Sequence, residues 1–194
     1  MTEYANPDVL VSTDWLEGQL DDPDVRVIEV DEDTTAYEKG HIRGAVGWNW
    51  TTDLHTPVGR DYLDQGGFAE LLSGAGVGSG TTVVLYGGNN NWFAAYAYWL
   101  LKLRGFDDVK LLDGGRKKWE LESREQTQEV PRYPATDLRI DGPAPGEQQT
   151  RARSFVVVAQ RPCDRGMRRS RFLSKTIRLL PRRPLLAPAW PCRT

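Results

Sequence analysis

Short apolar runs alternate with amphipathic segments through the first 125 residues of the chain. The apolar runs predict extended strands, which we place at 8–11, 25–30, 45–50, 81–86 and 109–112. The amphipathic segments predict helices, which we place at about 12–20, 65–76, 91–104 and 116–122. Strands that alternate with helices predict an α/β fold, with a parallel sheet of about five strands flanked by helices.

Several side chains predict where these helices begin, end and bury their surface. Ser12 is expected to cap the first helix, and Gly105 to end the helix that begins at Asn91. Trp15, Leu16 and Leu20 are expected to form the apolar face of the first helix. One helix carries an aromatic stripe, which we interpret first as a core face and second as a docking face: Trp92, Phe93, Tyr96 and Trp99.

The regular pattern stops after Glu125. Residues 126–150 are interpreted as a Pro-rich linker, and 151–194 as a basic tail. The tail is rich in Pro and Arg and sustains neither a helical nor a strand period, which predicts an unstructured segment. Its composition also resembles an out-of-frame reading of a GC-rich gene. The predicted domain therefore covers 8–125.

The net charge of −2 hides an uneven distribution along the chain. Residues 151–194 contain 11 Arg, 1 Lys and 1 Asp, whereas residues 1–150 have an excess of 13 acidic residues. The tail contains no recognisable nucleic-acid module and follows an acidic domain, so we expect no nucleic-acid partner. No stretch of 18 apolar residues predicts a membrane span. The start of the chain lacks the pattern of a signal peptide, and the chain has only two cysteines, which favours a cytoplasmic setting.

The stretch TVVLYGGNNNWFAAYAYW, at 82–99, predicts a strand, a tight loop and a helix in direct succession. The loop consists of Gly87, Gly88, Asn89, Asn90, Asn91 and Trp92. This arrangement points backbone N–H groups at a small site, where many enzymes place a nucleophile. Here the loop contains no nucleophile, acid or cation. A plain turn, which Gly and Asn tolerate, is favoured over weak anion binding or contact with a partner.

Three stretches, in order and at matching spacing, resemble the rhodanese (thiosulfate sulfurtransferase) family. These are AYEKGHIRGA (36–45), the strand–loop–helix above, and VKLLDGGRKKWELE (109–122). The sequence of these stretches is most similar to the N-terminal, non-catalytic half of two-domain members. The resemblance implies sulfur transfer from thiosulfate, a small anionic donor, to cyanide or a thiol. It implies a cysteine persulfide and no metal or organic cofactor.

This chain departs from the catalytic pattern that the resemblance implies. Active members place a Cys directly after the strand of the loop, where this chain has Gly87. Active domains also tend to carry an Arg after the first central strand, where this chain has Asp31, Glu32 and Asp33, which would repel thiosulfate. We therefore expect a domain that is inactive alone. The alternative is a non-catalytic binding module that docks a partner protein at the Trp92 loop.

The remaining residues are weaker candidates for a catalytic or ligand-binding role. Cys163, followed six residues later by Arg169, resembles an anion cradle, but Arg is so frequent in the tail that this spacing arises readily by chance. His41 is expected to bond to backbone in a turn, and His55 to be too isolated for a metal site. Asp113 is expected to organise a turn or cap the next helix. The run Arg116, Lys117 and Lys118 is expected to be a solvated helix face.

Overall fold

The computed structural model of the chain describes residues 7–56 and 61–141. Its elements are a short 3-10 helix, η1 (Pro7–Val9), five strands and five helices. The strands are β1 (Leu10–Val11), β2 (Val25–Asp31), β3 (Val46–Asn49), β4 (Thr82–Tyr86) and β5 (Val109–Leu112). The helices are α1 (Thr13–Glu17), α2 (Thr35–Lys39), α3 (Gln65–Gly74), α4 (Gly88–Arg104) and α5 (Gly115–Leu121). The predicted α/β fold is confirmed.

The five strands form one parallel sheet in the order β1-β5-β4-β2-β3. Strands β2 and β4 are neighbours in the middle of the sheet, with Glu29 of β2 opposite Tyr86 of β4. Parallel strands end at the same edge, so the residues that follow β2 and β4 meet there. This is the edge at which open α/β sheets bind ligands.

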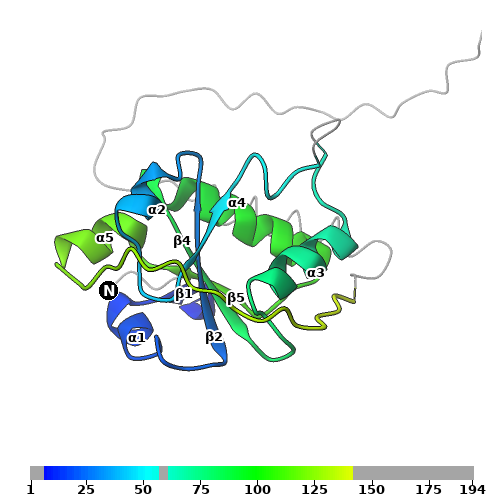
Figure 1. Cartoon of the computed structure of the whole chain (residues 1–194), viewed down its shortest axis with the longest axis horizontal. Coiled ribbons are helices and arrows are strands. Elements are labelled where there is room, and N and C mark those ends of the chain that lie inside the picture. The colour runs from blue at the N-terminus through cyan, green and yellow to red at the C-terminus, as the bar shows by residue number, and fades with distance from the viewer. Residues whose placement is uncertain (1–6, 57–60, 142–194) are drawn as a thin grey trace, which may run out of the picture. The chain divides into compact units, whose positions relative to one another are not determined.

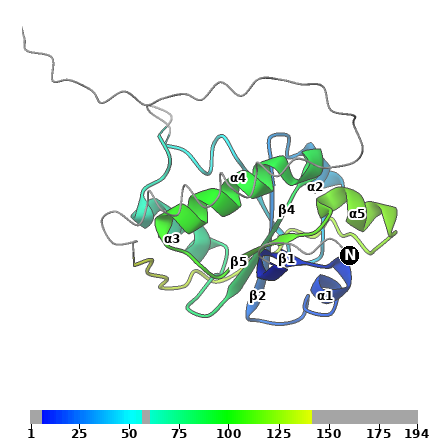
Figure 2. The ribbon, with the colours of Figure 1, turned by 180° about the vertical axis from the view of Figure 1, so that it is seen from behind.

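The two faces of the sheet carry separate apolar cores, because successive side chains of a strand point to opposite faces. On one face, Ile28 and Val30 of β2 pack with α3 and α4 through residues such as Phe68 and Leu101. On the other face lie Val25 and Val27 of β2, together with side chains of α1, α2 and α5: Leu16, Tyr37 and Trp119. Figures 1 and 2 show these helices on the two sides of the sheet.

The ends of two helices form as their residues predict, and one helix was missed. The Ser12 hydroxyl accepts the Trp15 N–H at 3.1 Å, and Gly105 ends α4 with a left-handed φ of 96°. Helix α2 lies between the predicted strands at 25–30 and 45–50, where no helix was predicted. It spans only five residues, and its one buried side chain, Tyr37, packs on Gly47 of β3. Such a short helix has no periodic signal and depends on tertiary packing.

The first helix was predicted with one error of burial. Leu16 is fully buried as expected, but Trp15 is 38% exposed. Helix α1 ends at Glu17, so it is shorter than expected and buries only one side of its single turn. The prediction that Trp15 faces the core is therefore wrong.

Residues 126–141 run across the domain from α5 towards α3, as the yellow segment in Figure 1. Thr127 and His41 exchange two backbone hydrogen bonds, of 2.8 and 2.9 Å. The Tyr133 ring lies over the Arg26 guanidinium, 3.6 Å from ring centroid to Cζ. Further along, Leu138 and Ile140 pack against the core on the α3 side. The described part of the predicted linker is thus attached to the domain.

Candidate functional site

The loop between β4 and α4 lies at the carboxyl edge of the sheet, where the sequence predicts it. Gly87 is buried, with an extended backbone. Three consecutive residues then have left-handed backbones: Asn89, Asn90 and Asn91, with φ of 47°, 55° and 63°. Asn tolerates this conformation better than most residues, which explains the run of three. The right-handed part of α4 therefore begins at Trp92.

Two side chains occupy the first N–H groups of the loop. The Gly87 N–H donates to the Asn91 Oδ1 at 3.0 Å, and the Asn91 Nδ2 donates to the Leu112 carbonyl at 2.7 Å. The Gly88 N–H donates to the Asp31 Oδ2 at 2.7 Å. Asp31 is buried, with 7% of its surface exposed. Two of the N–H donors that an anion could use at this end of the helix are thus engaged within the protein.

The backbone around Gly87 leaves no room for a side chain. A Cβ at this position would lie far inside van der Waals contact with the Val30 carbonyl oxygen, which belongs to the backbone of β2. A Cβ at Gly88 would lie 2.6 Å from the Asp31 Oδ2, which is the movable end of a side chain. Position 87, where the resemblance places a catalytic Cys, is therefore packed for glycine.

A buried ion pair lies beside the loop. Arg116 of α5 donates to both carboxylate oxygens of Glu29, with Nη2–Oε2 at 2.6 Å and Nε–Oε1 at 3.0 Å. Arg116 also donates through Nη1 to the Gly40 carbonyl at 2.8 Å, and through its backbone N–H to the Gly87 carbonyl at 3.1 Å. The Ile42 N–H donates to the Tyr86 hydroxyl at 3.1 Å. The three sequence motifs therefore meet around this pair.

Burial raises the pKa of Glu29, and the hydrogen bond from Arg116 opposes this rise. Burial also raises the pKa of Tyr86 well above its ordinary value, and the nearby Glu29 carboxylate adds to the effect. A bidentate pair with so little exposure, 9% for Arg116 and 2% for the Glu29 side chain, ties α5 to the centre of the sheet.

Arg116 is the main residue of this region that was misjudged from the sequence. It was expected on a solvated face with Lys117 and Lys118, but it is buried. Its neighbours are less buried, and Lys118 pairs with Asp113 at 3.1 Å. A charged residue among other charged residues gives no sequence signal of burial. Glu29, which lies between Ile28 and Val30 in a largely apolar strand, is the signal that could have indicated a buried cation.

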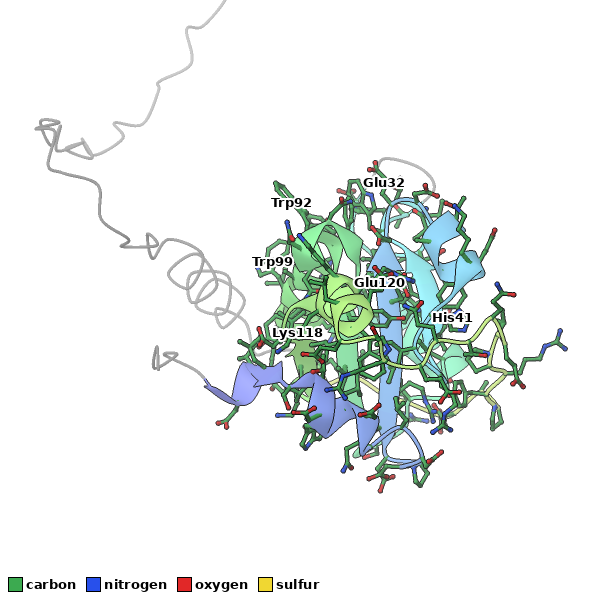
Figure 3. The ribbon with its side chains drawn as sticks, turned by 90° about the vertical axis from the view of Figure 1, so that its left-hand side faces the viewer. Glu32, His41, Trp92, Trp99, Lys118 and Glu120 are labelled. Atoms are coloured by element: carbon green, nitrogen blue, oxygen red, sulfur yellow. The ribbon has the colours of Figure 1, made fainter. Side chains whose placement is uncertain are left out.

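The prediction that the aromatic stripe of α4 is a core face is wrong for Trp92, whereas Phe93, Tyr96 and Trp99 are half-buried and pack against the core. Trp92 is 74% exposed, whereas the buried positions of the helix include Ala94, Ala97 and Leu101. The half-buried remainder of the stripe joins an aromatic cluster with three residues of the 50–62 region. This cluster consists of Trp50, His55, Tyr62, Phe93, Tyr96 and Trp99. Figure 3 shows Trp92 at the same end of the domain as Glu32 and Trp99 further along α4.

Both histidines have structural contacts. His41 is fully buried, with Nδ1 2.9 Å from the Tyr37 carbonyl oxygen and Nε2 3.0 Å from that of Glu129, which confirms the prediction of backbone bonding. His55 contacts the Tyr96 hydroxyl at 2.8 Å through Nε2. Within residues 7–56 and 61–141, no group of three or more His, Cys, Asp or Glu is placed to hold a metal ion.

Cys163 and Arg169, the candidate pair for an anion cradle, lie outside the described residues. Both cysteines of the chain do so, and residues 7–56 and 61–141 contain none. None of the described helices has the length and apolar character that a membrane crossing requires. Two surface hollows lie away from the 87–92 loop, one lined by Arg43, Gly44, Thr127, Glu129 and Pro131, the other by Asp8, Leu10, Val11, Ser12, Trp15 and Lys110.

Comparison with known proteins settles the family. The model of the rhodanese-like domain matches residues 12–122, more than half of the chain. This chain belongs to the rhodanese family. The rhodanese match contains β2, the 87–92 loop and all of α5, so it covers all three motifs that carried the resemblance.

Among curated relatives, the rhodanese domain is similar to a presumed thiosulfate sulfurtransferase of Mycolicibacterium smegmatis. The two are 56% identical over 139 residues, which is 72% of this chain and 50% of that protein. The sulfur carrier protein TtuD of Thermus thermophilus is 53% identical over 131 residues, 68% of this chain and 46% of that protein. The chain spans about half the length of these relatives.

Solved structures show the same rhodanese fold at lower identity. SseA from Escherichia coli, a 3-mercaptopyruvate sulfotransferase, has a TM-score of 0.61 at 23% identity, over 70% of this chain and 56% of that chain. YnjE has a TM-score of 0.61 at 25% identity, over 71% of this chain and 35% of that chain. These likenesses concern the fold.

Proposed function

We propose that residues 7–141 form a non-catalytic domain of a thiosulfate sulfurtransferase, and that the 194-residue chain alone transfers little or no sulfur. The relatives that share half or more of their residues with this chain over the matched region include sulfurtransferases and a sulfur carrier. The observation that carries the proposal is position 87, where a glycine is packed against the Val30 carbonyl. A reducing cytoplasmic setting is proposed with it.

The chemistry of sulfur transfer explains why position 87 decides the matter. A thiolate attacks the outer sulfur of thiosulfate, the S–S bond breaks, and sulfite leaves while the enzyme keeps a persulfide. Cyanide then takes the outer sulfur as thiocyanate, which regenerates the thiolate. Both steps need a thiol at the loop. Gly87 has none, and the Asn residues that follow supply amides, which are not sulfur nucleophiles.

A thiosulfate:cyanide assay on the purified 194-residue chain, beside Cys163→Ser and Cys192→Ser variants, tests this proposal. We expect no thiocyanate above the rate without protein from any of the three. Thiocyanate production by the chain that disappears in Cys163→Ser would overturn the proposal, because it would place a working thiol in the basic tail at 151–194. The same preparations should show the folded far-ultraviolet circular dichroism of an α/β protein, which excludes a trivial loss.

One observation favours a second function, a binding module that docks a partner protein. Trp92 is 74% exposed at the end of the loop, next to an aromatic cluster on α4. Trp is among the residues that most often anchor protein interfaces. A partner that presents an apolar pocket to this side chain would bind without any chemistry at the loop.

Affinity capture with the full chain separates these two functions. Proteins retained by the wild type should be lost with Trp92→Ala and kept with Trp15→Ala, because Trp15 is a partly exposed Trp on α1. Equal retention by both variants, or no specific retention by the wild type, would contradict a binding role for the loop.

A further inference from the structure

The Asp31 carboxylate lies at the start of α4, although it belongs to the end of β2. Its Oδ2 accepts the Gly88 N–H at 2.7 Å, and its Oδ1 accepts the Glu32 N–H at 3.2 Å. Backbone N–H groups at the start of a helix are the groups that bind small anions. Gly88 is the first of the 17 residues of α4, and the right-handed turns follow from Trp92. One of its first donors therefore already holds an anion that is part of the protein.

The space above Gly88 is filled by the same carboxylate. An atom added to the Gly88 Cα would lie 2.6 Å from the Asp31 Oδ2 and 3.5 Å from its Cγ. An oxygen of an external anion cannot occupy this position while the carboxylate is there. Asp31 is also 7% exposed, so solvent screens its charge poorly.

Residues 87–92 themselves contain no cationic side chain that could compensate an external anion. Residues 87–92 are glycines, asparagines and a tryptophan. The buried guanidinium nearby, on Arg116, is already bound to both oxygens of Glu29. A second anion at the loop would thus meet the full repulsion of Asp31 without a free partner among these residues.

We propose that Asp31 is the residue that closes the 87–91 loop to small oxyanions, by acting as a built-in carboxylate ligand of the Gly88 N–H. This inference rests on the proposed function, since it explains how a non-catalytic rhodanese domain avoids holding the sulfur donor. The backbone N–H groups of the loop are present, and the Asp31 carboxylate prevents thiosulfate and sulfate from reaching them.

Titration of the isotope-labelled full chain with sodium sulfate and sodium thiosulfate, followed by amide NMR at constant ionic strength, tests the inference. Three variants are compared with the wild type. Asp31→Ala removes the ligand and opens the space, Asp31→Asn keeps an acceptor oxygen in place, and Glu32→Ala removes an exposed neighbouring charge. We expect saturable shifts of the 87–92 amides only in Asp31→Ala, with an affinity at least about tenfold above that of the wild type, because a like charge in contact is removed.

Several results would overturn the inference. These are saturable binding by the wild type as tight as by Asp31→Ala, no binding by a folded Asp31→Ala, or an equal gain in Glu32→Ala, which would indicate general repulsion. Should Asp31→Ala not fold, Asp31→Ser decides in its place, since its shorter, uncharged side chain also removes the carboxylate from the space above Gly88, and absence of binding by folded Asp31→Ser overturns the inference. Sulfur transfer by the wild type is measured separately, so failure of the proposed function is recognised independently.

Discussion

Glu29 and Asp31 are two buried carboxylates on the same strand, two residues apart, and they have different partners. Glu29 is bound by the guanidinium of Arg116, which joins α5 to the sheet. Asp31 is bound by the backbone N–H groups of Glu32 and Gly88 and forms no ion pair within residues 7–56 and 61–141. The difference teaches that one carboxylate supports the architecture through a charge pair, whereas the other occupies a loop that ligands could otherwise enter.

Removal of the cation should have the largest effect. In Arg116→Met the apolar stem remains while Glu29 loses its partner, and the free energy of unfolding should fall by about 3–5 kcal/mol near pH 7. Denaturant unfolding of the full chain measures it. Lys118→Met is the control, because its pair with Asp113 is partly exposed and should contribute less than about 1 kcal/mol. Equal losses in the two variants would contradict the structural role of Glu29 and Arg116.

The defect of Arg116→Met should depend on pH. Burial raises the pKa of Glu29 above its ordinary value of 4.5, and removal of Arg116 takes away the main opposing influence. The native state then binds a proton more tightly than the unfolded state, so stability falls as pH rises from 4.5 through the raised pKa. We therefore expect the loss measured at pH 5 to be smaller than at pH 7. A loss that grows on acidification would contradict this assignment.

Substitutions in the loop glycines come next. Gly87→Ala places a methyl group against the backbone of β2, and should cost about 1–3 kcal/mol. Gly88→Ala meets only the end of the Asp31 side chain, which can turn away, so it should cost less. Thermal unfolding measures the stability of both variants.

A Gly87→Cys variant should be destabilised like Gly87→Ala and should still produce no thiocyanate. Restored activity would show that the packing at position 87 does not prevent sulfur transfer.

Substitution of two loop asparagines distinguishes the contribution of side-chain hydrogen bonds to stability from that of the left-handed backbone. Asn91→Gly keeps a residue that accepts the left-handed backbone but removes two hydrogen bonds, to Gly87 and Leu112, and should cost about 1–2 kcal/mol. Asn89→Gly is the matched control, since Asn89 is also left-handed but exposed, and should be neutral or slightly stabilising. Denaturant midpoints of the two variants should therefore differ, and identical midpoints would mean that the Asn91 amide contributes nothing.

The smallest effect is expected on the outer side of the loop. Trp92→Ala should change the free energy of unfolding by no more than about 0.5 kcal/mol, because the side chain is 74% exposed. Trp119→Ala, at a side chain that is 1% exposed, should cost about 3–5 kcal/mol. Calorimetric unfolding of both variants tests this, and a large loss in Trp92→Ala would mean that this side chain packs within the domain.

The sequence predicted the elements with strong local signals. Strand β4 is an almost continuous apolar run and β2 a largely apolar one, and Ser12 and Gly105 mark helix ends through their own conformational preferences. Helix α2 was missed because it is too short to show a period. The predicted boundaries of the Pro-rich linker and the basic tail stay predictions, because residues 142–194 lie outside the described part of the chain.

The sequence by itself determined the α/β fold, the rhodanese motifs and the absence of a cysteine at position 87, since these follow from residue identity and periodicity. The tertiary structure decided which charges are buried, that Arg116 pairs with Glu29, that Asp31 accepts the Gly88 N–H, and that Trp92 of the α4 stripe is exposed. The physical reason is that burial and pairing depend on residues far apart in the chain. Glu29 and Arg116 are separated by 87 positions, and Asp31 and Gly88 by 57, so no local pattern contains these partners.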